Sequence, residues 1–153
     1  MTFTDSIKSC LNKYATFRGR APRSEYWWFW LFCVLVEVAT TVIFGIIGYL
    51  FGKDLGAIIA GCVGAFLSSL LLFLPLLAVL VRRLHDTNYS GWWSLLYVGL
   101  LITSEMERSY RNSVYNEWIY LISLILLVVI IIWLLVLLLK DSDEENQYGL
   151  PVY

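Results

Sequence analysis

The chain has 153 residues, of which 59% are hydrophobic and only 15% are charged, with a formal net charge of −1. A soluble domain averages about 25% charged residues, so this composition excludes a soluble globule, a disordered chain and a nucleic-acid-binding domain. The charges lie between four long apolar stretches. This pattern predicts a small all-α membrane protein, a polytopic transmembrane helical bundle formed by a single domain.

The first predicted element is a short amphipathic helix in the N-terminal cytoplasmic segment, residues 1–23. Thr4 or Asp5 is placed to cap this helix. It either lies in the membrane interface or packs against the cytoplasmic ends of the spans. Its apolar residues recur at helical spacing: Phe3, Ile7, Cys10, Leu11 and Tyr14.

Four membrane spans follow, because a helix needs about 20 apolar residues to cross a bilayer. The third apolar stretch is short, so three spans plus a re-entrant or interfacial segment is the alternative. An acidic tail over residues 140–153 completes the chain. The predicted transmembrane helices cover residues 26–51, 55–81, 89–106 and 118–139.

Basic residues set the predicted orientation of these spans. The N-terminal segment, the loop after the second span and the tail carry 8 of the 11 lysine and arginine residues. The positive-inside rule therefore places both termini in the cytoplasm, with the spans forming a multi-pass membrane protein.

Small residues form two adjacent ladders along the second span, each with a spacing of four residues. Within lipid, such a smooth face allows helices to approach closely and pack. The first span is the expected partner, reached through the tight connection at residues 52–54, and dimerisation through the same face is the alternative. The ladders are Gly56, Ala60, Gly64 and Ser68, and Ala57, Gly61, Ala65 and Ser69.

Glu37 is the only charged residue inside the four apolar stretches. At about 1.5 Å per residue it lies near the bilayer midplane, where a carboxyl is costly and must face the bundle interior. Ser68, Ser69 and Thr103 reach a similar depth. Glu37 is then either a neutral, hydrogen-bonded structural group or part of a proton or solute pathway.

Two polar clusters flank the spans, and the predicted topology brings both to the cytoplasmic leaflet. Arginines there either anchor in the headgroup region and pair locally, or bind anionic lipid headgroups, another phosphate or a protein partner. Catalysis by His85 beside Asp86 is disfavoured, because adjacent helical residues do not face each other. The candidate residues are Arg18, Arg20, Arg23, Arg82, Arg83, His85, Asp86, Trp92 and Trp93.

The three cysteines have no metal-ligand spacing, so we expect free thiols and no metal or cofactor. Neither a nucleophile motif nor a glycine-rich phosphate loop is present in the sequence. We therefore expect no catalytic residue. The acidic tail is expected to be solvated, with folding back onto the arginines as the alternative.

Three motifs resemble a known family. They are F-x-G-R-x-x-R-x-E-Y-W at residues 17–27, R-R-L-H-D-T-x-x-S-G-W-W at residues 82–93 and the tail Asn146-Gln147-Tyr148-Gly149-Leu150-Pro151. Over about residues 10–151 the chain resembles the bacterial inner-membrane family DUF 805, a domain of unknown function. Family members usually have a basic residue after the asparagine and an aspartate before the proline, and they lack the longer polar stretch at residues 105–117.

The resemblance implies a location in the bacterial inner membrane and no established activity. Together with the residues, it predicts a non-enzymatic accessory or interaction protein that contacts lipid headgroups, another membrane protein or a second copy of itself. A small transporter or channel subunit that uses Glu37 is the alternative.

Overall fold

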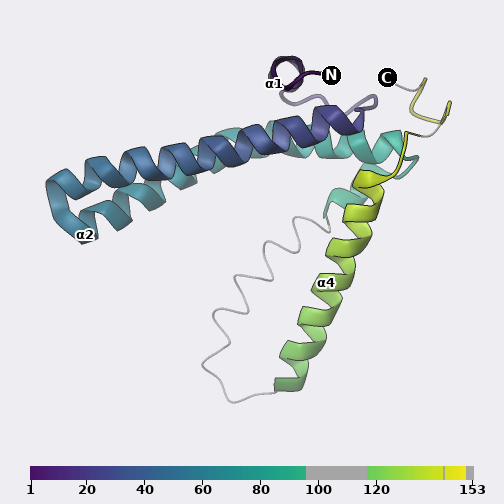
Figure 1. Cartoon of the computed structure of the whole chain (residues 1–153). Coiled ribbons are helices and arrows are strands. Elements are labelled where there is room, and N and C mark those ends of the chain that lie inside the picture. Colours follow the sequence, from purple (N-terminus) through teal and green to yellow (C-terminus); the bar gives the residue numbers. More distant parts are fainter. Residues whose placement is uncertain (96–116, 143, 151–153) are drawn as a thin grey trace. The chain divides into compact units, whose positions relative to one another are not determined.

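The computed structural model describes residues 1–95, 117–142 and 144–150. Within these ranges the regular secondary structure is helical, apart from an isolated bridge between Asn146 and Gly149. This confirms the all-α prediction for the described part of the chain. The elements are α1 (Phe3–Asn12), α2 (Arg23–Asp86), the 3-10 turn η1 (Gly91–Trp93) and α4 (Glu117–Leu139) (Figure 1).

The chain divides into two compact units. The first contains residues 1–17 and 24–80, and the second contains residues 18–23 and 81–153. The first unit therefore holds α1 and most of α2, and the second holds the end of α2, η1, α4 and the tail.

Helix α1 begins with a reciprocal cap. The Thr2 hydroxyl accepts a hydrogen bond from the Asp5 main-chain N–H at 3.3 Å and donates to the Asp5 carboxylate at 2.6 Å. These hydrogen bonds lower the pKa of Asp5. The expectation that Thr4 or Asp5 is the cap was wrong, because the helix begins one residue after Thr2, whose hydroxyl accepts from the Asp5 N–H.

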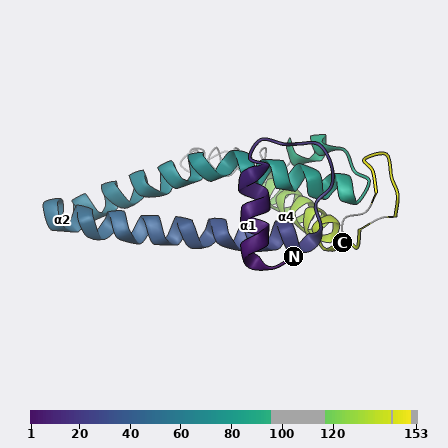
Figure 2. The same cartoon turned by 90° about the horizontal axis from the view of Figure 1, so that it is seen from above.

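One face of α1 packs within the first unit. Ser6 and Cys10 are buried, and the Ser9 hydroxyl donates to the Glu25 carboxylate at 3.0 Å. The hydroxyl of Tyr14 donates to the carbonyl of Leu71. Helix α1 thus runs across both arms of α2 near one end (Figure 2).

Helix α2 is a hairpin of two arms. Its 64 residues are interrupted at Gly52 and Lys53, which have non-helical backbone angles, so that residues 23–51 and 54–86 run side by side in opposite directions (Figures 1 and 2). Lys53 has a φ of 50°, a region in which a side chain is strained.

Glycines bring the two arms close together. A Cβ atom on Gly48 would lie 2.1 Å from the Gly56 carbonyl oxygen and 2.5 Å from the Ala60 Cβ. A Cβ on Gly64 would meet the Phe44 ring at 2.8 Å, and one on Gly61 would meet the Thr41 carbonyl at 3.4 Å. We call this line of contacts the hairpin seam. The small-residue ladder of the second arm thus lies against the first arm.

In the second unit, α2 ends in a Schellman motif. Asn88 adopts a φ of 61°, its N–H donates to the His85 carbonyl at 3.1 Å, and the Tyr89 N–H donates to the Leu84 carbonyl at 2.9 Å. Asparagine tolerates this left-handed conformation. Ser90 then caps η1 by accepting from the Trp92 N–H.

Helix α4 covers the predicted fourth span. Its Trp133 ring meets Tyr89 edge-on at 5.8 Å and Trp93 at 4.8 Å. Most of the predicted third span, including Thr103, lies outside the described residues. Within those residues, α2 alone is long and apolar enough for a membrane crossing, and Leu124–Leu139 is a shorter apolar segment. The number of spans stays a prediction.

Candidate functional site

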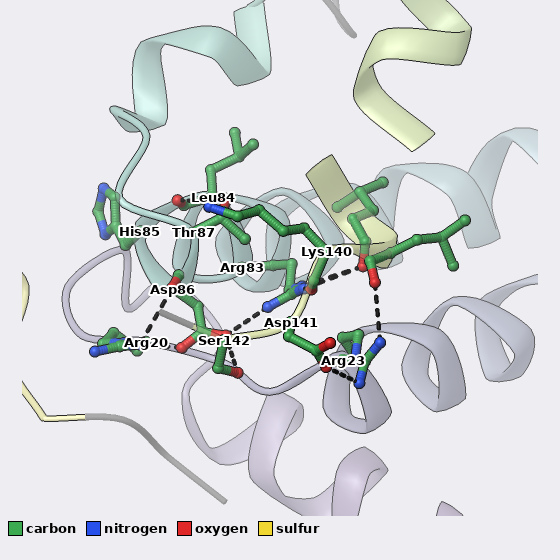
Figure 3. Close-up of polar contacts among 12 residues, drawn as sticks. Arg20, Arg23, Arg83, Leu84, His85, Asp86, Thr87, Lys140, Asp141 and Ser142 are labelled. Atoms are coloured by element: carbon green, nitrogen blue, oxygen red, sulfur yellow. Dashed lines mark hydrogen bonds and ion pairs between the residues drawn. The ribbon is translucent and has the colours of Figure 1, made fainter. Parts of the chain in front are cut away.

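A buried carboxylate, that of Asp86, lies at the centre of the polar contacts in the second unit (Figure 3). One oxygen accepts from Arg20 Nε at 2.8 Å. The other accepts from Arg83 Nη1 and from the Ser142 hydroxyl, both at 2.5 Å. The three charged side chains are at most 1% exposed. We call Arg20, Arg83, Asp86 and Ser142 the arginine–aspartate cluster.

Other guanidinium donors of the cluster bind main-chain carbonyls of α2, of the tail and of α4. Arg20 Nη2 donates to the carbonyl of Asp86 at 3.1 Å. Arg20 Nη1 donates to the carbonyls of Glu144 and Gly149, each at 2.8 Å. Arg83 donates to the carbonyl of Leu138 from Nε at 3.3 Å and from Nη2 at 3.2 Å, and also to the carbonyl of Lys140. A cation at a helix C-terminus satisfies carbonyls that have no helical partner and is favoured by the helix dipole.

A second ion pair lies beside the cluster. Arg23 contacts the carboxylate of Asp141 and donates to the Leu139 carbonyl at 2.9 Å. The side chains of this pair are 47% and 85% exposed. Such solvent-exposed pairs contribute at most about 1 kcal/mol, whereas removing one partner of a buried pair leaves an uncompensated charge and costs more.

His85 binds the tail through its ring and its main-chain carbonyl. Its ring stacks on Tyr148 at 3.9 Å between centroids, its Nδ1 lies 3.2 Å from the Gly19 carbonyl, and its carbonyl accepts from the Asn146 amide at 3.0 Å. Burial lowers the pKa of His85, and the contact with Gly19 opposes that shift. The neutral imidazole is thus favoured by the fold.

The other predicted residues divide between the interior and the surface. Arg82 is buried at 1% exposure, and its main-chain carbonyl accepts from the Ala21 N–H at 3.1 Å. Arg18 is exposed. Trp92 and Trp93 are also exposed, at 77% and 42%, and the ring of Trp93 contacts that of Trp133.

The cluster fastens chain segments together and has the energetics of a buried ion network. Burial lowers the pKa of Arg83, and the adjacent Asp86 carboxylate opposes this shift. Desolvating such charges is costly, and close hydrogen-bonded pairing offsets the cost. In the part of the chain that the structure describes, no group of three potential metal-ligating side chains comes together.

The other predicted polar group, in the first unit, joins the two arms of α2. The carboxylate of Glu37 accepts from Ser69 at 2.7 Å and from Ser68 at 3.0 Å. The Thr40 hydroxyl lies 3.0 Å from that of Ser68. Thr103, the third predicted hydroxyl, lies outside the described residues.

The chain that carries these motifs matches a known protein family. The family model described as "Protein of unknown function (DUF805)" matches residues 14–150. This chain belongs to that family. The match confirms the resemblance drawn from the three motifs.

Two similar proteins of Escherichia coli strain K12 are both named as inner membrane proteins. YhaH is 43% identical over 90 residues, which cover 58% of this chain and 68% of YhaH. YhaI is 39% identical over 89 residues, which cover 58% of this chain and 67% of YhaI. No solved structure matches the chain significantly.

The sequence favoured a solvated tail, with folding back onto the arginines as the alternative. The structure of this DUF805 chain has the alternative, because Arg20 and Arg83 donate to the carbonyls of Glu144 and Lys140. Ser142, Asn146, Tyr148 and Gly149 all contact the cluster or His85, and none was predicted. The available signal was the turn chemistry: the Asn146 side chain accepts from the Tyr148 N–H at 2.9 Å, and Gly149 adopts a φ of 113°. Asparagine and glycine are the residues that such turns favour.

Proposed function

We propose that this DUF805 chain is an integral, multi-pass protein of the bacterial inner membrane with both termini in the cytoplasm, and that it acts without catalysis by engaging anionic lipid headgroups. The long apolar arms of α2, the biased basic residues and the names of the two relatives support the location.

The observation that carries the proposal is the division of the basic residues. Lys8, Lys13 and Arg18 are exposed, whereas Arg20 and Arg83 are buried and donate to Asp86 and to main-chain carbonyls. Headgroup binding is therefore assigned to the exposed basic residues of the N-terminal segment.

Exposed apolar side chains accompany these charges. Leu11, Tyr14 and Phe17 are each about 40% exposed, so the segment combines apolar surface with positive charge. Juxtamembrane lysine and arginine contribute about 1 kcal/mol each toward an anionic surface. Three such residues would favour anionic over neutral lipid by about a hundredfold.

The test compares the thermal unfolding of purified protein in nanodiscs of phosphatidylcholine with and without phosphatidylglycerol. We expect the anionic lipid to stabilise the wild type, and we expect the triple variant Lys8→Gln, Lys13→Gln, Arg18→Gln to lose most of that gain. Lys53→Gln is the matched control, because Lys53 is an exposed lysine at the tip of the hairpin. A triple variant that keeps the full response to phosphatidylglycerol would contradict headgroup binding and favour a protein partner or a second copy.

Transport or channel activity through Glu37 is the second candidate function. The favouring observation is that the Glu37 side chain is half-buried and connected to the hydroxyls of Ser68, Ser69 and Thr40. Proteoliposomes test it by proton or solute flux. A flux that the wild type supports and Glu37→Gln abolishes would favour this candidate, and equal fluxes would end it.

A further inference from the structure

The hydrogen bonds around Glu37 leave a choice for each hydroxyl hydrogen. Ser69 Oγ lies 2.7 Å from Glu37 Oε1 and also 2.7 Å from the Ala65 carbonyl one turn earlier in its own helix. A hydroxyl has a single hydrogen and two acceptor lone pairs. Ser69 therefore donates its hydrogen either to Glu37 or to the Ala65 carbonyl. When it donates to Ala65, its oxygen can accept a hydrogen bond from Glu37.

Ser68 has the same choice. Its hydroxyl lies 3.0 Å from Glu37 Oε2, 3.1 Å from the Gly64 carbonyl and 3.0 Å from the Ala65 carbonyl. Thr40 lies 3.0 Å from Ser68 Oγ and 2.9 Å from the Val36 carbonyl. Every hydroxyl of the group thus has a helix carbonyl to which it can turn.

These distances satisfy the carboxyl in two states. When Glu37 is ionised, Ser69 and Ser68 each donate to one carboxylate oxygen. When a proton is added to Oε1, the new O–H donates to Ser69 Oγ, and the Ser69 hydrogen turns to the Ala65 carbonyl. Only hydrogens move, and each donor keeps an acceptor.

We infer that Glu37, Ser68, Ser69 and Thr40 form a proton-binding site inside the α2 hairpin. The ligand is a single proton, taken up by the carboxylate and given back from the carboxyl without rearrangement of the two arms. Cys33 is the titratable residue one turn before Glu37 in the same arm, and the opposite arm presents Ser68 and Ser69 to the carboxylate. The site does not depend on headgroup binding.

Infrared difference spectroscopy of the reconstituted protein tests this inference. The carbonyl stretching band of a neutral carboxyl marks the protonated state, and subtracting the spectrum of Glu37→Gln isolates the contribution of Glu37. We expect a band that is present at low pH and lost at high pH while the protein stays folded. The amide of Glu37→Gln has nearly the shape of the carboxyl, so the variant retains an acceptor for a serine.

Ser69→Ala supplies an independent readout, because Ser69 is exposed and its loss spares the hairpin seam. The variant loses a donor to the charged carboxylate and an acceptor for the neutral carboxyl. Because the hydrogen bond to the charged form is the stronger of the two, the pH at which the band is lost should move upward. Thr41→Val is the matched control: its hydroxyl donates to the main-chain carbonyl of Glu37 at 2.7 Å, so the midpoint should not move.

Three results would overturn the inference. One is a Glu37 band that is constant across the pH range, and another is the absence of any such band. The third is a band that disappears at constant pH when sodium replaces choline, because that would indicate a metal-cation site instead. A midpoint unchanged in Ser69→Ala would show that the hydroxyl takes no part in binding.

Discussion

The hairpin seam lies within the first unit and the arginine–aspartate cluster within the second, and the two stabilise their own units by different interactions. The seam joins arms that follow each other through a tight turn, and it uses glycines whose backbones nearly touch. The cluster joins Arg20 and Ser142 to Asp86, residues that are 66 and 56 positions away along the chain, and it uses buried charge.

The comparison teaches that different kinds of substitution destabilise the two regions. Close helix packing depends on side-chain size and needs no charge. A buried ion network depends on charge balance, because a charge that loses its partner keeps its desolvation cost. The seam should therefore be sensitive to an added methyl group, and the cluster to a lost charge.

The largest expected effect is that of Asp86→Asn. It leaves the buried guanidiniums of Arg20 and Arg83 without their shared carboxylate, which should cost about 3–5 kcal/mol of unfolding free energy. Thermal or denaturant unfolding in detergent measures the loss. Asp141→Asn is the control, because its ion pair with Arg23 is exposed and should cost less than about 1 kcal/mol. Equal losses in the two variants would refute the assignment of stability to the buried cluster.

Gly48→Ala should rank second. The new Cβ would lie 2.1 Å from the Gly56 carbonyl oxygen, so the arms must separate, at a cost of about 1–3 kcal/mol. Gly52→Ala is the matched control, since nothing lies within 4 Å of its Cβ position and its φ is negative. If both variants unfold at the wild-type temperature, the seam is not the close contact described above.

Asn146→Ala should have a smaller effect on the second unit. It removes the hydrogen bond to the His85 carbonyl and the one received from the Tyr148 N–H, which should cost about 1–2 kcal/mol. Hydrogen exchange at the tail amides gives a second measurement, and protection should fall there first. Gln147→Ala, at an exposed position, should leave both measurements unchanged.

The smallest expected effect is a dependence on pH through His85. Its pKa is lowered in the folded protein from an ordinary value of 6.5, so protonation favours the unfolded state. The contribution of His85 is therefore present above pH 6.5 and lost as the pH falls through the lowered pKa. His85→Gln should flatten the fall in unfolding temperature between about pH 7 and pH 5. A slope identical to that of the wild type would assign the pH dependence to other groups.

Local signals were readable from the sequence. Helical spacing predicted the N-terminal helix, and the connection at residues 52–54 marked the position of the reversal. The predicted depth of Ser68 and Ser69 matched that of Glu37, and the structure places all three together.

The remaining contacts left no such signal. The docking of the tail depends on main-chain carbonyls of Glu144 and Gly149, and every residue type carries the same carbonyl. The pairing of Arg20 with Asp86 depends on the path of the linker before α2, which no periodicity records. The cap of α1 was mispredicted because Thr2, Thr4 and Asp5 are all residue types that cap helices, and the sequence does not show which of them precedes the first turn.

The recognition of main-chain oxygens by Arg20 and Arg83 has a consequence for how freely the tail can change. A tail in which Glu144 and Glu145 were replaced by neutral residues would still present the main-chain carbonyls of positions 144 and 149 to Arg20. A tail that kept every acidic side chain but lost the turn between Asn146 and Gly149 would present them in the wrong places. The acidic positions 144 and 145 should therefore tolerate substitution. The path of the backbone and the side chains of Ser142 and Asn146, rather than the negative charge of Glu144 and Glu145, fix the tail on the protein.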